Sequence, residues 1–135
     1  MSKPRVTAYW DLIVWQRAMG LAEAIYQLTE RFPSSERFGL VAQMRRAAVS
    51  VASNVAEGHS RGWTRDYLRF IMMARGSVAE LETQCLLAQR LGFVADPQVA
   101  PVLAIGDEVG RMLAGLRRRL RARLSRDNSP LAPRP

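Results

Sequence analysis

A seven-residue apolar repeat between residues 65 and 91 constrains the fold of this chain more than any other feature. Apolar side chains recur in alternating steps of four and three, at Tyr67, Ile71, Ala74, Val78, Leu81, Cys85 and Ala88. This spacing puts them all on one face of an α-helix and suits side-by-side helix packing. The repeat therefore predicts a long helix over residues 65–91 with one buried face.

Three further amphipathic helices are predicted, over about residues 11–31, 35–57 and 97–124. The first carries two adjoining apolar stripes, Leu12, Trp15, Met19, Ala22 and Tyr26 beside Ala18, Leu21, Ile25 and Leu28. The second carries Leu40, Met44, Ala47, Ala48, Val51 and Val55. The fourth turns inward Val99, Val102, Leu103, Val109, Leu113, Leu116, Leu120 and Leu124.

Helix breakers and capping residues separate these segments. Phe32-Pro33-Ser34-Ser35 ends the first helix, because proline blocks continuation and a serine caps the start of the second. Gly58 stands where a left-handed residue is expected after the second helix. Thr64 and Asp96 are candidate caps of the last two helices. Long helices joined by short loops predict an all-α fold, an antiparallel up-down-up-down four-helix bundle.

The length of 135 residues leaves room for one domain. We expect an N-terminal arm over residues 1–10, the bundle over 11–124 and a disordered tail over 125–135. No apolar stretch reaches the roughly 18 residues of a membrane span, and the start lacks the apolar block of a secretory signal. A single cysteine excludes an intramolecular disulfide. These features indicate a cytoplasmic protein without a membrane partner.

Positive charge is concentrated near the C-terminal end. The chain has 20 basic and 12 acidic residues, and Lys3 is its only lysine. Residues 111–126 contain no acid and seven arginines, Arg111, Arg117, Arg118, Arg119, Arg121, Arg123 and Arg126. Such a block predicts contact with a polyanion, most simply nucleic acid. The alternative is a solvated helix end whose arginines offset the helix dipole. Offsetting the dipole requires fewer than seven arginines.

A polar row borders the apolar faces of the second and third helices. It consists of Arg46, Ser50, Asn54 and Glu57 on one helix and Ser77, Glu80 and Gln84 on the other. Because buried polar groups must be hydrogen-bonded, this row predicts a structural network that fixes helix pairing, within one subunit or between subunits. A catalytic alternative would use Glu57, Glu80 and Glu82 as metal ligands or acid–base groups.

The other sequence features argue against catalysis. Di-metal bundles need paired Glu-x-x-His motifs, and the only histidine, His59, has no glutamate three residues before it. Cys85 falls inside the apolar repeat and is interpreted as a core residue. We therefore expect no metal, no cofactor and no enzymatic activity.

The first and third helices carry more apolar surface than a four-helix monomer needs. The third helix has a second, partly apolar stripe that includes Phe70, Met73, Leu87 and Leu91. This surplus predicts self-association, and the alternative is one broad core-facing stripe.

Several motifs resemble a known family, the four-helix-bundle proteins encoded within 23S rRNA intervening sequences. The opening run from Asp11 through Trp15 is similar, as are Phe32-Pro33 with Glu36, Gly39-Leu40, and the run 43–50. The most specific motifs are Ser53-Asn54-Val55-Ala56-Glu57-Gly58 and Gly76-Ser77-Val78-Ala79-Glu80-Leu81-Glu82-Thr83. The resemblance covers residues 11–91.

The resemblance implies an antiparallel four-helix bundle that assembles into a ring-like homopentamer, without an established activity. The accessory proteins of diversity-generating retroelements look similar in fold, and they imply nucleic acid and a reverse transcriptase as partners. The fourth helix carries no motif diagnostic of that group.

The leading hypothesis is a non-enzymatic oligomer that binds RNA or DNA through the arginine block with little sequence specificity. Candidate secondary contacts are Arg45, Arg46, Arg61, Arg65 and Arg69, and Trp63 is a candidate stacking residue. The second hypothesis is a scaffold whose arginines dock an acidic partner protein. A third is a metal-dependent hydrolase using Glu57 and Glu80.

Overall fold

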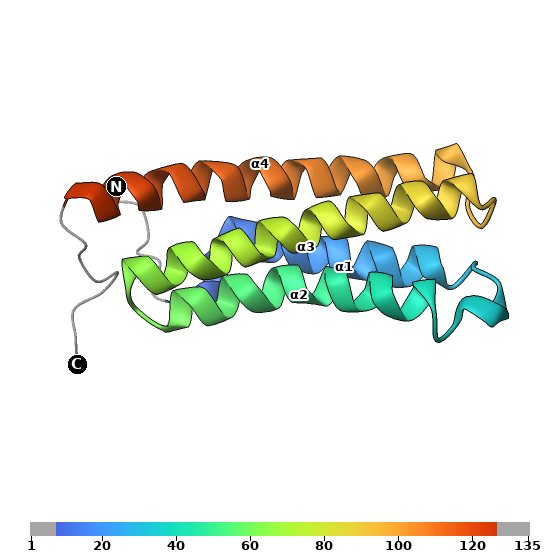
Figure 1. Ribbon diagram of the computed structural model, residues 1–135, viewed down its shortest axis with the longest axis horizontal. Helices are drawn as coiled ribbons and strands as arrows, with labels where there is room; N and C mark the ends of the chain where they lie inside the picture. The colour runs from blue at the N-terminus through green and yellow to red at the C-terminus, as the bar shows by residue number, and fades with distance from the viewer. Residues whose placement is uncertain (1–7, 127–135) are drawn as a thin grey trace.

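The computed structural model describes residues 8–126, and within that range it contains helices and no strands. They are η1 (Tyr9–Asp11), α1 (Ile13–Thr29), η2 (Ser34–Glu36), α2 (Leu40–Ser60), α3 (Thr64–Arg90) and α4 (Asp96–Arg126). The η segments are single 3₁₀ turns. The four α-helices lie side by side in an elongated bundle (Figure 1). No helix among the described residues has both the length and the apolar content to cross a membrane.

The buried core follows the predicted helical repeats. All seven side chains of the α3 repeat are buried, none more than 4% exposed, so that prediction is confirmed. On α1 the buried stripe is the one containing Ala18, Leu21 and Ile25, while Met19 and Tyr26 of the other stripe are exposed. Burial of apolar side chains on every helix is the main stabilising contribution in such a bundle.

Each α-helix packs against two neighbours. The packed pairs are α1 with α2, α2 with α3, α3 with α4, and α4 with α1. A diagonal pair is absent among the described residues. Figure 1 shows the α1–α2 and α3–α4 connections at one end and the short α2–α3 connection at the other, where α4 also finishes. The arginine-rich part of α4 therefore shares an end with the α2–α3 connection.

The start of α2 differs from its prediction. Ser34 and Ser35 form the 3₁₀ turn η2 instead of a helix cap, and α2 begins five residues later than expected, at Leu40. Oε1 of Glu36 accepts a hydrogen bond from the backbone N–H of Leu40 at 3.2 Å. Glu36 thus satisfies one of the free N–H groups at the start of α2, the role expected of a serine.

Gly58 also differs from its prediction. It lies inside α2 and is buried, while Gly62 has the positive φ, +79°, that ends the helix. A Cβ atom on Gly58 would stand 2.6 Å from Cβ of Phe70, closer than real Cβ contacts. Gly58 is therefore needed because α3 passes close to its backbone.

The other boundaries differ by smaller amounts. The residue before α3 is Trp63, in extended conformation, and it makes no side-chain cap hydrogen bond, so Thr64 opens the helix without being its cap. Asp96 is the first residue of α4, and Oε1 of Gln98 accepts the N–H of Ala95 just before it. α4 continues to Arg126, two residues into the predicted tail. The predicted arm up to residue 7 and the tail from residue 127 lie outside the described residues.

Candidate nucleic-acid interface

The seven arginines of the basic block all lie on the second half of α4. Leu113 and Leu120 are buried against the bundle and fix which side of the helix faces the core. At 3.6 residues per turn, the arginines fan out over the remaining directions around the helix. Five of them are exposed and two, Arg117 and Arg123, are half-buried. Positive charge therefore covers the whole outer circumference of this helix end.

Arg111 differs from the rest of the block because a carboxylate compensates it. Its Nη2 lies 2.9 Å from Oδ2 of Asp107, one turn earlier on α4. Such i,i+4 pairs are common on exposed helix faces. The ion pair leaves Arg111 less available to a partner than the block alone suggests.

Four consecutive or near-consecutive arginines form the uncompensated centre of the block. We call them the arginine quartet, Arg117, Arg118, Arg119 and Arg121. Within residues 8–126, no member of the quartet lies within ion-pair distance of a carboxylate. Like charges held together without a counter-charge repel one another, and an anion that binds there relieves the repulsion.

Arg117 shows this repulsion most clearly. The charge of Arg121 is the largest cause of a lowered Arg117 pKa, followed by desolvation and by the charges of Arg75 and Arg118. Nε of Arg117 is buried and has no hydrogen-bond partner among the described residues. Arg75 lies on α3, so a second helix contributes to the positive cluster. Sequence reasoning missed Arg75, although it directly follows a buried position of the apolar repeat.

Gly115 brings two quartet side chains together. A Cβ on Gly115 would lie 3.4 Å from Nη1 of Arg119 and 3.7 Å from Nη2 of Arg118. Both guanidinium groups therefore fold back over the same stretch of α4. A hollow of about 270 Å³ beside them is lined by Arg111 and Arg119 and by residues at the start of α1.

Tyr67 closes the inner side of this hollow. Its hydroxyl is buried and has no hydrogen-bond partner among the described residues. Burial raises the pKa of Tyr67 to about 12, although the charge of Arg119 acts in the opposite direction. Its phenol is therefore protonated at neutral pH and remains a hydrogen-bond donor.

The candidate secondary contacts divide between the two ends of the bundle. The guanidinium carbons of Arg61 and Arg69 each lie 5.0 Å from the ring centre of Phe70. These residues are near the α2–α3 connection, at the same end of the bundle as the quartet. Arg61 is also paired with Glu57 at 3.1 Å. Arg65 is exposed on the first turn of α3 at that end. The predicted stacking residue Trp63 also lies there, half-buried in the connection.

Arg45 and Arg46 lie at the opposite end. Arg45 is in the first half of α2, where Nε donates to Oγ1 of Thr29 at 2.9 Å and Nη2 to the carbonyl oxygen of Tyr26 at 3.3 Å. The structure therefore does not bring Arg45 and Arg46 together with the basic block.

Three members of the predicted polar row are in contact. The hydroxyl oxygens of Ser50 and Ser77 lie 2.9 Å apart and link α2 to α3. Nδ2 of Asn54 donates to the hydroxyl and to the carbonyl oxygen of Ser50, both at 2.9 Å. Glu57 instead pairs with Arg61, and Arg46 and Glu80 are exposed. Gln84 is buried, and its Oε1 has no hydrogen-bond partner among the described residues. The row thus contains a hydrogen-bonded centre on α2 and α3, and its other members do not join it.

The residues considered for catalysis are dispersed. Within residues 8–126, no three His, Cys, Asp or Glu side chains come close enough to hold a metal ion. His59 meets the ring of Tyr67 edge-on at 5.5 Å, and burial lowers its pKa. Burial, reinforced by the charge of Glu82, raises the pKa of the Cys85 thiol to about 11. The thiol is therefore protonated at neutral pH and unsuited to nucleophilic attack.

These features define an all-α four-helix bundle with a concentrated arginine cluster at one end. Residues 10–115 match the family described as 23S rRNA-intervening sequence protein, so the chain belongs to that family. A solved structure with a similar fold is that of a protein with unknown function from the S23 ribosomal protein family of Bacteroides thetaiotaomicron VPI-5482. It has a TM-score of 0.70 at 18% identity, over 78% of this chain and 98% of that chain. No curated protein matches the chain.

The family match ends at residue 115, two residues before the arginine quartet begins at Arg117. The buried faces of α1, α2 and α3 lie within the matched range, whereas the last turns of α4 do not. The family therefore accounts for the bundle, and the quartet needs an explanation from this chain's own residues.

Proposed function

We propose that this chain is a non-enzymatic protein that binds nucleic acid, RNA or DNA, with little sequence specificity and no cofactor. The observation that carries the proposal is the arginine quartet, four guanidinium groups that have no carboxylate partner within residues 8–126. Arginine donates to phosphate oxygens in a planar, bidentate geometry. Phosphate contacts position a nucleic acid without reading its bases, which is why loose specificity is expected.

The quartet and Arg75 contribute to binding in different ways. Exposed members of the quartet reach outward to phosphates, while Arg75 raises the local potential from α3. Electrostatic attraction of this kind also speeds association with a polyanion. A cytoplasmic location and any protein partner remain predictions from the sequence.

Replacing all four quartet residues by glutamine is expected to weaken binding by about tenfold or more at low salt. Glutamine has nearly the helix propensity of arginine, so α4 should persist. The measurement is fluorescence anisotropy of a labelled structured RNA and a matched duplex DNA titrated with protein. The control replaces Arg31 and Arg90, which are exposed at the other end of the bundle. Equal affinity of the quartet variant and the wild type would contradict the proposal, as would a control variant that loses as much.

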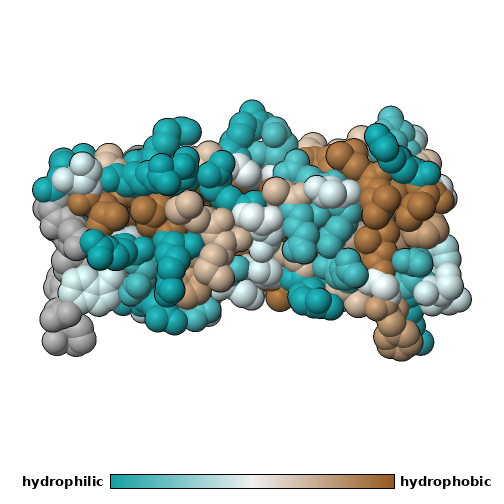
Figure 2. All heavy atoms as spheres, in the orientation of Figure 1, coloured by the Kyte–Doolittle hydropathy of each residue, from teal (hydrophilic) through white to brown (hydrophobic). Residues whose placement is uncertain are grey.

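We further propose that the bundle is antiparallel and that copies of it assemble into a ring-like homo-oligomer. Two contacts support opposite directions of α2 and α3, because Ser50 meets Ser77 whereas Gly58, later on α2, meets Phe70, earlier on α3. Assembly is supported by exposed apolar side chains on α3 and directly after it, Met72, Met73, Leu86, Leu87 and Leu91. Figure 2 shows an apolar patch towards the end where α3 finishes. A face of this kind is typical of an interface.

Replacing Met73 and Leu87 by glutamate is expected to dissociate the oligomer. The two side chains are 50% and 45% exposed and lie two heptads apart on α3, so the change should leave the bundle core intact. A carboxylate buried at an interface without a partner is costly. Sedimentation equilibrium should give a multiple of 15.2 kDa for the wild type and a mass near 15.2 kDa for the variant. A wild-type protein that sediments as a monomer would contradict the assembly.

A further inference from the structure

A second basic hollow lies between α1 and the start of α2, at the end of the bundle away from the arginine quartet. Its volume is about 530 Å³, within the range of small-molecule and cofactor sites. Two aromatic rings and three arginines line it, Tyr26, Phe38, Arg37, Arg45 and Arg46, together with small apolar side chains. None of the residues that line it is acidic. The basic block does not account for this combination of rings and cations.

Phe38 is the most exposed large apolar side chain among the described residues, at 90%. It stands just before α2, and the guanidinium carbon of Arg37 lies 5.7 Å from its ring centre. A fully exposed ring contributes nothing to the core of the bundle, because it buries no surface there. The ring is instead free to stack on a partner.

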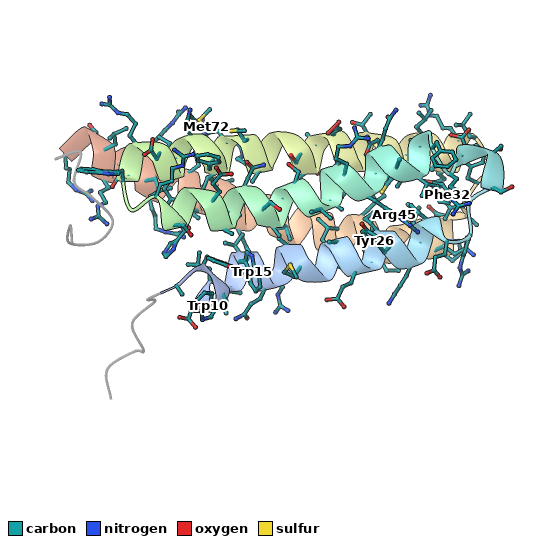
Figure 3. All side chains as sticks on the ribbon, turned by 90° about the horizontal axis from the view of Figure 1, so that it is seen from below. Trp10, Trp15, Tyr26, Phe32, Arg45 and Met72 are labelled. Carbon is teal, nitrogen blue, oxygen red and sulfur yellow. The ribbon has the colours of Figure 1, made fainter. Side chains whose placement is uncertain are left out.

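Arg45 holds the second ring in place. Its guanidinium carbon lies 4.5 Å from the ring centre of Tyr26, close enough for a cation–π interaction. The hydrogen bonds from Arg45 to Thr29 and to the carbonyl of Tyr26 tie this pair to the end of α1. Figure 3 shows Tyr26 and Arg45 side by side, far from Trp10 and Trp15. The Tyr26–Arg45 pair therefore forms a fixed wall of the hollow, whereas the Phe38 ring projects into solvent beside it.

Glu36, which directly precedes Arg37, is occupied elsewhere. Glu36 is half-buried and its Oε1 accepts the N–H of Leu40 at the start of α2. Of the three arginines, Arg37 and Arg46 are exposed and have no ion-pair partner within residues 8–126. The hollow thus offers ring faces together with two uncompensated positive charges.

From this arrangement we infer that the hollow binds an unstacked base of a single-stranded nucleic acid. The base stacks on Phe38 against the Tyr26–Arg45 wall, and Arg37 and Arg46 contact the flanking phosphates. Aromatic rings beside cations are how proteins hold single strands, since every base has a face to stack and every link has a charge. A duplex cannot use this hollow, because its bases are already stacked and paired. The inference rests on the proposed nucleic-acid function and names the kind of strand that is bound.

The test compares single-stranded and duplex ligands in wild type and in the Phe38→Ala variant. A single-stranded oligonucleotide carrying one 2-aminopurine reports stacking by a change in its fluorescence, and anisotropy gives affinity for it and for the matched duplex. Phe38→Ala is expected to lower single-strand affinity about tenfold, to abolish the fluorescence change and to leave duplex affinity unchanged. Phe38→Trp, which keeps an aromatic face, should restore both signals. Because Phe38 is exposed, all three proteins should give the same circular dichroism spectrum.

Each result separates this inference from the proposed function. Unchanged single-strand affinity in Phe38→Ala, alongside a large loss in the quartet variant, would overturn the stacking site and leave the quartet's role intact. An equal loss on single strands and duplex would also overturn it, because Phe38 would then act through assembly or a general effect on the protein. Absence of any binding by the wild type would overturn the proposed function and the stacking site together. Selective loss on single strands with rescue by tryptophan supports the site.

Discussion

Replacing Gly58 by alanine is expected to lower the free energy of unfolding by about 3 kcal/mol. The added methyl group would stand 2.6 Å from Cβ of Phe70 and 3.2 Å from Cδ1 of Tyr67. Cβ of Phe70 is attached directly to the α3 backbone, so no side-chain rotation moves it away. The two helices must separate instead, and the buried contacts around Phe70 are lost. The gain in helix propensity, at most about 1 kcal/mol, offsets only part of this cost.

Gly20→Ala is the matched control for this substitution. Gly20 is exposed in the middle of α1, and a Cβ placed there would meet no atom within 4 Å. Alanine at this position should raise the free energy of unfolding by about 0.5–1 kcal/mol, because glycine is the more flexible residue in the unfolded chain. Urea denaturation followed by circular dichroism measures both variants. Similar stability of Gly58→Ala and Gly20→Ala would show that α2 and α3 are not held as close as the structure places them.

Gly58 also illustrates where prediction from the sequence succeeded and where it did not. The α3 repeat was sufficient to predict the buried face of that helix, because the face follows from the chain's own periodicity. The end of α2 was predicted wrongly because a glycine near a helix end has two common reasons. It can adopt the left-handed conformation that ends the helix, or it can allow a neighbouring helix to pack closely. Which reason applies to Gly58 depends on where Phe70 of α3 lies, and the sequence does not show that. Gly62, four residues on, has the left-handed conformation instead.

The candidate site shows the same division. The basic block was evident from the sequence because charge density needs no knowledge of the fold. The compensation of Arg111 by Asp107 was not predicted, although their i,i+4 spacing permits it, because the acid lies just before the block. The contribution of Arg75 was not predicted either, because it depends on how α3 and α4 are aligned.

The hollow around Phe38 could not be anticipated for a related reason. Tyr26 and Arg45 are separated by the turn between α1 and α2, and their stacking depends on where α2 begins. The sequence predicted that α2 begins five residues earlier than it does. In such a helix Phe38 would be a helical residue and would point in another direction than it does in the structure. The folded chain brings two rings and three arginines to one place, which residue types alone do not show.

Binding of nucleic acid by the wild type is expected to weaken roughly a hundredfold between 50 and 200 mM monovalent salt. Each arginine of the quartet that neutralises a phosphate releases condensed counterions, and bulk salt opposes that release. Four such contacts give a slope of about −3.6 in a plot of log affinity against log salt on duplex DNA. The measurement is the anisotropy titration repeated at five salt concentrations. Several subunits contacting one strand would make the slope steeper still.

The slope distinguishes phosphate binding from other uses of the same arginines. The quartet variant should lose about 0.9 units of slope for each arginine replaced. The variant lacking Arg31 and Arg90 should keep the wild-type slope, because those side chains lie at the other end of the bundle from the quartet. If the wild type and the quartet variant had parallel salt plots, the quartet would not contact phosphates. Its uncompensated charge would then require an acidic protein surface, whose binding would survive nuclease treatment and would not compete with RNA.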